Sequence, residues 1–574
     1  MKKGKRFLTK YGFRLFLFAA VLAFFLAAGH AGPVQFDDSG SYIRIRWHEG
    51  VMPVYPLFLL CNQCLFGDAS YLWAVIVEQA LLAAFSVVLL EESIRKQFGF
   101  HPAEGGLFCV LALYPYTIEM PGAVMTQAIL TEGIAYSLFY VFLTVLLKAV
   151  WKKSYAWLAG AFGMTLFLSA VRSQLQILFG VCGIVFLYLV CMRGKGKGKV
   201  KKLLGFLAGL AGCAAVSLTG VLLVLGIVRG YHVMLQTDHS LYLFGLKVQH
   251  PEIYEIVLEE RRQEEEARAA AEENKVQGTA QEPQTATEKA QETKEGLQTV
   301  TEETQTQESV EEAEAQECPM EPQEEEEPLV NKNFSTSQYL TLLFSRGMYE
   351  ADYEDAELFT DPVLKGLYLA LYEAVDAEEE RYAYAKEGLW MWKDIVGGLG
   401  KIGGICFMTP SEYYVEHAPE IIESEQFSDI RSGHLQTIGL TLIRAHAGRV
   451  LYHALMLLPQ AFICTVFFQF APLYLFCHLV TAFLYLSGLV LMIWGYADVR
   501  TRKDGAEMMA LILGTNVVMV LIISLVFFGQ QRYLVYTFGP FYMAYYLLLR
   551  QLWRVRVRGF LKKKFLKKNE EMQR

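Results

Sequence analysis

Residues 1–32 read MKKGKRFLTKYGFRLFLFAAVLAFFLAAGHAG, a basic opening followed by an uninterrupted apolar run. The first fourteen residues hold six Lys and Arg. The run that follows is close to the roughly 20 residues that cross a bilayer. Positive charge holds its own flank on the cytoplasmic side, so residue 31 onward is expected outside. The run is either a retained first span or a signal peptide, because AGHAG resembles a cleavage site. We favour the retained span because further spans follow.

Similar apolar runs recur and predict an all-α polytopic membrane protein, a transmembrane helix bundle of about 10–11 spans. The predicted spans are residues 12–30, 70–91, 105–120, 127–148, 155–172, 174–192, 203–228, 472–496, 506–529 and 533–550. With ten spans, the basic connections all fall on one side, which predicts a plasma-membrane protein with both termini cytoplasmic. Residues 451–469 are also apolar. As a full span they would move the basic residues 500–503 outside, so we expect an interfacial or re-entrant helix there.

The composition supports this class and excludes others. The chain is 53% hydrophobic and 20% charged, whereas soluble domains average about 25% charged. With its apolar runs, this excludes a simple soluble enzyme, a secreted disulfide scaffold and a nucleic-acid-binding domain, so no nucleic-acid partner is expected. The ten Cys are scattered and indicate no disulfide framework.

Charge divides the chain into a basic body and an acidic insert. Residues 251–330 hold 25 Glu, no Asp and 6 Lys or Arg, a local charge of −19. Since the whole chain carries −8, the remainder carries +11. Such a Glu-rich stretch buries too little apolar surface to offset its chain entropy, and disorder is expected.

These features predict six segments. They are an N-terminal transmembrane module (1–230) with a long outer loop (31–69), an outer connection (231–255), a disordered acidic insert (256–330), a small, mostly helical extracytoplasmic cap (331–450), a C-terminal transmembrane module (451–552) and a basic cytoplasmic tail (553–574).

The first outer loop carries the strongest chemical pattern, FDDSGSYIRIRWHEGVMPVYPLF (36–58). Asp37 and Asp38 lie close to the predicted membrane face, where acids are costly unless they have a partner or a function. Two adjacent carboxylates can act as a base or hold a divalent cation. Tyr42 and Tyr55 follow them and are candidate pocket residues.

This order of residues resembles the first outer loop of the GT-C superfamily of polyprenyl-phosphate-sugar-dependent glycosyltransferases. It is most similar to the branch of protein O-mannosyltransferases and lipid A aminoarabinose transferases (glycosyltransferase family 39). There an Asp-Glu pair precedes an aromatic residue, and a Pro-x-Tyr-Pro element follows. The alignment implies that Asp38 is the catalytic acid. The family's Glu is Ser39 here, and the extra acid Asp37 precedes.

Three further elements resemble the family in the same order. LTEGIAYSLFYVFLTVLLK (130–148) places Glu132 at the outer end of a span, where the family has an acid that helps to bind metal or donor phosphate. FLSAVRSQLQILF (167–179) carries Arg172, without the family's Pro. GQQRYLVYTFGPFYMAYYLLL (529–549) carries Arg532 and Tyr533 in an Arg-Tyr motif. Separately, Glu119 in YPYTIEMPG (114–122) is a candidate extra pocket acid.

The physical chemistry of these residues favours a phosphate site. Arg172 and Arg532 suit a phosphate because a planar guanidinium holds two oxygens, and Tyr533 accompanies them. A divalent cation such as Mg²⁺ or Mn²⁺ can bridge Asp38, Glu132 and phosphate. Alternatively, Glu132 serves as a helix-terminal charge partner and the arginines reach lipid headgroups.

The resemblance implies transfer of a sugar from an undecaprenyl-phosphate donor to an extracytoplasmic acceptor hydroxyl, with inversion. The partners would then be the lipid donor, the acceptor and the bilayer, in cell-envelope glycan or protein glycosylation. A transporter or flippase of lipid-linked saccharides is the alternative. It explains the spans, but not an acid-bearing outer loop with an outer cap, because transporters place ionisable groups near the midplane.

Overall fold

The computed structural model confirms an all-helical chain with apolar helices long enough for a membrane. The structure describes residues 2–43, 52–117, 123–193, 199–235, 240–251, 253–259, 261–263, 338–377, 391–422, 427–467, 473–498, 503–526 and 529–557. Within these ranges there are helices and no strands, apart from a single bridge between Val34 and Ala128. Eight of the described helical segments are long and apolar enough to cross a bilayer, so a multi-pass membrane protein is plausible.

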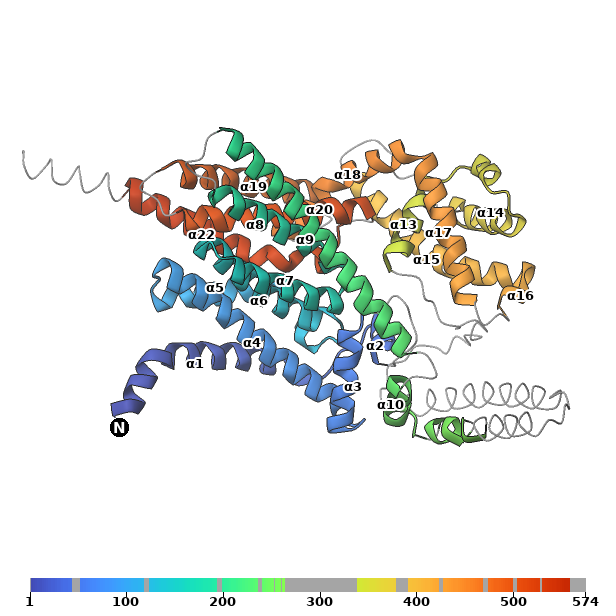
Figure 1. The fold of residues 1–574 in the computed structure, drawn as a ribbon, viewed down its shortest axis with the longest axis horizontal. Helices are drawn as coiled ribbons and strands as arrows, with labels where there is room; N and C mark the ends of the chain where they lie inside the picture. Colours follow the sequence, from blue (N-terminus) through green and yellow to red (C-terminus); the bar gives the residue numbers. More distant parts are fainter. Residues whose placement is uncertain are drawn as a thin grey trace, which may run out of the picture. The chain divides into compact units, whose positions relative to one another are not determined.

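Figure 1 shows the described helices, coloured from the N-terminus to the C-terminus. They are α1 (Lys2–Ala28), α2 (Gly40–Ile43), α3 (Val54–Phe66), α4 (Tyr71–Phe98), α5 (Pro102–Leu113), α6 (Glu132–Lys152), α7 (Tyr155–Val171), α8 (Leu178–Arg193), α9 (Lys199–Met234), α10 (Ser240–Gln249), α13 (Gln338–Tyr349), α14 (Pro362–Asp376), α15 (Met391–His417), α16 (Pro419–Ile422), α17 (Phe427–Ala445), α18 (Ala447–Val466), α19 (Tyr474–Ala497), α20 (Asp504–Val526), α21 (Gln531–Leu534) and α22 (Phe538–Leu552). Short 3-10 turns link several of them, among them η2 (Asp37–Ser39) and η7 (Tyr353–Leu358).

The helices of the structure agree in part with the ten spans predicted from the sequence. Seven of the ten predicted spans coincide with long apolar helices. The other three form the shorter helices α5, α7 and α22, of 12, 17 and 15 residues. In α5 the helix passes into a 3-10 turn at Tyr114–Tyr116, which contains Pro115. The eighth long apolar helix is α18, which we had expected to be interfacial or re-entrant; its length and composition are sufficient for a span.

The N-terminal and C-terminal helices form one bundle whose polar contacts gather at two opposite ends. At one end Arg550 of α22 bonds Glu104 of α5 at 2.8 Å. Gln97 of α4 bonds Asp504 of α20 at the same distance, and this end also contains the basic residues that close α4 and α6. At the other end Tyr136 of α6 and Arg172 at the end of α7 contact Arg532 and Tyr533 of α21, and that end holds the candidate site.

The chain forms two compact units, residues 1–236 with 332–574 and residues 237–331. The first unit contains the bundle and the predicted cap, whose described part is helical (α13–α17). In the second unit, the predicted outer connection forms α10. Most of the predicted acidic insert, and the tail from residue 558, lie outside the described residues.

Candidate functional site

The chain after α1 is fastened to the loop that precedes α6. Val34 donates its amide to Gln127 O at 2.9 Å and accepts from the Ile129 amide at 3.0 Å. The Ser39 hydroxyl, fully buried, donates to Ile129 O at 2.9 Å and accepts from the Phe36 amide at 2.8 Å. Ser39 therefore anchors the turn that carries Asp38.

Asp38 lies against an arginine that is nearly 500 residues away in the chain. Arg532 Nη1 donates to Asp38 Oδ2 at 3.4 Å. Their side chains are 34% and 48% exposed, so water reaches this ion pair. Arg532 also contacts Gln530 Oε1 through Nε at 3.2 Å, which orients the guanidinium from its other edge. A long, exposed ion pair of this kind is weak, and a competing anion can replace the carboxylate.

A second, much more buried ion pair stands beside it. Arg172, the residue that ends α7, pairs with Glu132 at the start of α6, and the two side chains are 13% and 2% exposed. Thr131 joins them, because its hydroxyl accepts from Arg172 Nη1 at 2.9 Å and donates to Glu132 Oε2 at 3.0 Å. This arrangement fixes Arg172 at the site, since separating a buried pair strands a desolvated charge.

Tyr533 brings the two arginines together. The Arg172 guanidinium lies 5.1 Å from the centre of the Tyr533 ring, and the Arg532 guanidinium lies 5.0 Å from it. Arg532 Nη2 also donates to the Tyr533 hydroxyl at 3.0 Å. Cations are held against aromatic faces by the ring quadrupole. One ring therefore keeps two like charges close to each other and close to Asp38.

Tyr42 and Tyr55 form the opposite wall of the same site. Their rings meet edge to face at 5.5 Å, and Tyr55 donates to Gln79 Oε1 at 3.4 Å. Gln79 in turn donates to the carbonyls of Thr126 and Ala128, so α4 supports the loop before Glu132. Gly133 permits this contact, because an added Cβ would overlap the Gln79 amide.

The electrostatics keep the tyrosines neutral and the arginines charged. Burial raises the pKa of Tyr42 to about 12, with Arg172 acting in the opposite direction. Burial also raises the pKa of Tyr55. For Arg172, burial disfavours the charged form, but the Glu132 carboxylate outweighs it and raises the guanidinium pKa. The phenols can therefore donate hydrogen bonds, while the arginines supply positive charge.

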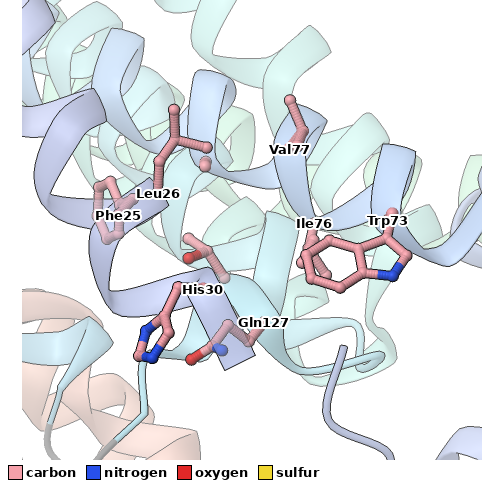
Figure 2. Close-up of a pocket in the computed structure, with 10 residues that line it drawn as sticks. Phe25, Leu26, His30, Trp73, Ile76, Val77 and Gln127 are labelled. Carbon is pink, nitrogen blue, oxygen red and sulfur yellow. The ribbon is translucent and has the colours of Figure 1, made fainter. Parts of the chain in front are cut away.

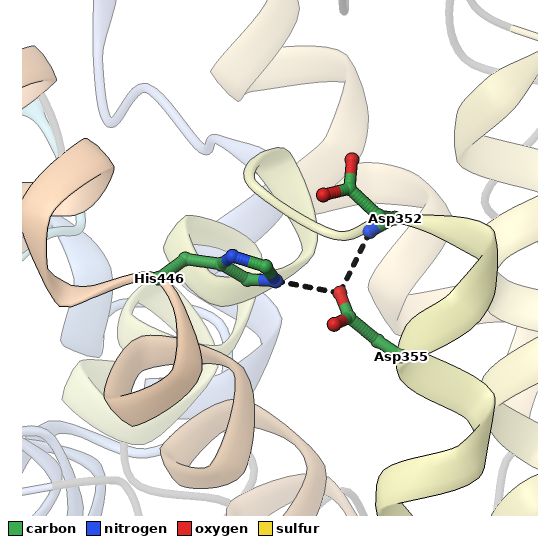
Figure 3. A group of neighbouring side chains, drawn as sticks. All are labelled: Asp352, Asp355 and His446. Carbon is green, nitrogen blue, oxygen red and sulfur yellow. Dashed lines mark hydrogen bonds and ion pairs between the residues drawn. The ribbon is translucent and has the colours of Figure 1, made fainter.

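A metal ion fits this donor set poorly. In the described part of the chain the site offers two carboxylates, Asp38 and Glu132, and each faces an arginine. Among the same residues, the group of three potential metal ligands lies elsewhere, at Asp352, Asp355 and His446 (Figure 3). There Arg449 bonds both Asp352 and His446, so a side-chain cation already occupies the group.

A small apolar recess lies between α1 and α4 (Figure 2). Its cavity volume is about 80 Å³, and it is partly open to the surroundings. Its lining includes Phe25, Leu26, His30, Trp73, Ile76, Val77 and Gln127. None of the charged residues of the site lines it, so it is a separate feature of the fold.

Sequence reasoning found most of this site but not all of it. The structure brings together Asp38, Tyr42, Tyr55, Glu132, Arg172, Arg532 and Tyr533. Glu119 lies outside the described residues, as does the side chain of Asp37. Thr131, Gln530 and the anchoring role of Ser39 were missed; Thr131 and Gln530 each lie within two residues of a predicted site residue. No protein-family model, curated protein or solved structure matches the chain.

Proposed function

We propose that the chain is a membrane glycosyltransferase that moves a sugar from an undecaprenyl-phosphate-linked donor to an extracytoplasmic acceptor hydroxyl, with inversion. The observation that carries this proposal is the contact of Asp38 with Arg532 while Arg532 shares the Tyr533 ring with Arg172. A carboxylate and two guanidinium groups, the groups that a general base and a phosphate site require, lie together in these contacts, which supports the proposal.

The charges favour a donor with a single phosphate. Arg172 is neutralised by the buried Glu132, and Arg532 is neutralised by the water-exposed Asp38. When a phosphodiester takes the place of Asp38 on Arg532, one negative charge replaces another. A diphosphate would bring a second negative charge, and the described site residues leave no further cation unpaired to meet it.

When the donor phosphate replaces Asp38 on Arg532, the Asp38 carboxylate also becomes free to act as the base. Once the donor phosphate binds Arg532, the Asp38 carboxylate is released from its ion pair and can accept a proton from the acceptor hydroxyl. The acceptor oxygen then forms a bond to the anomeric carbon as the bond from that carbon to the phosphate oxygen breaks. The leaving phosphate keeps the electron pair and gains a negative charge. Arg532 and Arg172 stabilise that charge in a partly desolvated site.

A transfer assay tests the proposal. The purified full-length chain in lipid nanodiscs is offered polyprenyl-phosphate sugars, and release of polyprenyl phosphate is measured. Asp38→Asn should lower the rate by about 10²–10⁴-fold, the usual contribution of a general base. Asp68→Asn is the matched control, because Asp68 is an exposed acid that bonds Gln63 outside the site.

The outcomes separate enzyme from transporter. Donor consumption that Asp38→Asn abolishes and Asp68→Asn preserves supports transfer. Movement of intact donor across the bilayer of sealed proteoliposomes, with no cleavage of any donor offered, would instead identify a flippase and refute the proposal.

A further inference from the structure

Helix α18 joins the cap to the segment that carries Arg532. It packs against α15 and α17 of the cap and against α20, α21 and α22. Arg346 of α13 also bonds Val450 in its first half. α21 contains Arg532. One helix therefore touches both the cap and the candidate site.

At the cap end, α18 is fastened by ionic contacts along one helical face. His446, Arg449 and His453 are spaced i, i+3 and i+7, a spacing that places side chains on the same side of a helix. They pair respectively with Asp355 at 2.6 Å, Asp352 at 2.6 Å and Glu350 at 2.6 Å. We call these three contacts the cap seam. Figure 3 shows two members on the η7 side, Asp352 and Asp355, facing His446.

The cap seam is buried at one end and open at the other. Glu350 and His453 are 1% and 4% exposed, whereas Asp352 and Arg449 are about half exposed. Arg346 of α13, fully buried, adds a hydrogen bond from Nη2 to Val450 O at 3.3 Å. A buried contact of this kind resists separation because breaking it leaves polar groups without their hydrogen-bond partner. The cap therefore holds the first half of α18 in a single position.

At the site end, α18 clamps the chain just before Arg532. Gln460, fully buried, donates to Gly529 O at 2.5 Å and accepts from the Gly529 amide at 3.0 Å. Gln531 donates to Phe467 O at 2.9 Å. Gly529 lies so close to α18 that an added Cβ would overlap Ala461. Gly529 and Gln531, which precede Arg532 in the chain, are thus fixed to the second half of α18 and the residue after it.

We propose that the cap sets the position of Arg532 through α18. Pro459 lies between the two halves, and because it lacks an N–H it removes one helical hydrogen bond there. Loosening the cap seam then frees the first half of α18 and, through the Gln460 clamp, increases the motion of residues 529–537. This inference does not require the proposed sugar transfer.

Hydrogen–deuterium exchange on the full-length chain in nanodiscs tests the coupling without any substrate. Asp352→Asn breaks the half-exposed pair and should raise exchange at residues 529–537 by up to about fivefold, the factor for one exposed ion pair. Glu350→Gln weakens the buried Glu350–His453 contact and should raise exchange at residues 529–537 by about tenfold or more. Glu357→Gln is the control, since it removes the exposed Glu357–Lys365 pair within the cap.

Increased exchange at 446–453 with wild-type exchange at 529–537 overturns the proposal, because the seam would then open without affecting the site. If Glu350→Gln does not fold, the half-exposed Asp352→Asn variant still decides. A missing transfer activity would leave this measurement unaffected, so the two proposals fail separately.

Discussion

The two arginines of the site should differ sharply in what their loss does to stability. Arg172→Met leaves Glu132 with its charge desolvated, because that side chain is 2% exposed. Stranding a buried charge costs about 3–5 kcal/mol. Arg532→Met leaves Asp38 about half in water, and an exposed pair contributes less than about 1 kcal/mol. Both variants should lose donor binding, but Arg172→Met alone should be strongly destabilised.

Thermal and denaturant unfolding of the variants in nanodiscs measures this difference. The double variant Arg172→Met/Glu132→Gln removes both buried charges, so it should recover most of the lost stability while binding of the donor stays lost. Equal destabilisation by the two single variants, or no recovery in the double variant, would refute the assignment of Glu132–Arg172 as the buried structural pair.

Three further outcomes follow from the same geometry. Tyr533→Phe should keep the donor KM within about fivefold, whereas Tyr533→Leu should raise it about tenfold, because Leu offers no ring to the two guanidinium groups; similar KM values for both would exclude the ring as their support. Because the pKa of Tyr42 is raised to about 12, its phenol stays protonated up to about pH 10. Tyr42→Phe should therefore keep the wild-type pH profile of kcat/KM up to that pH. Loss of an alkaline limb of the profile in this variant would contradict this. EDTA should leave transfer unchanged because arginines supply the positive charge; activity lost with EDTA and restored by Mn²⁺ would show a metal in the step.

The helices could be predicted from the sequence where the length of an apolar run alone determines them. The long helices α1, α4, α6 and α20 follow from uninterrupted apolar runs, which are stable in a bilayer only as helices. α5 and α22 were less predictable, because they are shorter than the apolar stretches that contain them. α18 was ambiguous because its sequence has the length of a span, but a span there would move the basic residues 500–503 outside.

Individual residues of the candidate site could be selected from the sequence, but the hydrogen bonds between them could not. Asp38 was singled out because acids near the membrane face are costly without a function. Arg172 and Arg532 were singled out because their motifs resemble those of the GT-C superfamily. Thr131 could not be recognised, because its hydroxyl matters only once the end of α7 reaches the start of α6. Ser39 was noted only as a departure from the family pattern, since its contact with Ile129 depends on loop pairing.

Equilibrium binding of polyprenyl phosphate shows whether the donor phosphate replaces Asp38 on Arg532. Asp38→Asn frees Arg532 from its ion pair, so this variant should bind the lipid phosphate up to about fivefold more tightly than the wild type while failing to transfer sugar. Arg532→Met should bind it more weakly. If Asp38→Asn weakens binding as much as Arg532→Met does, or transfers sugar at the wild-type rate, the account is contradicted.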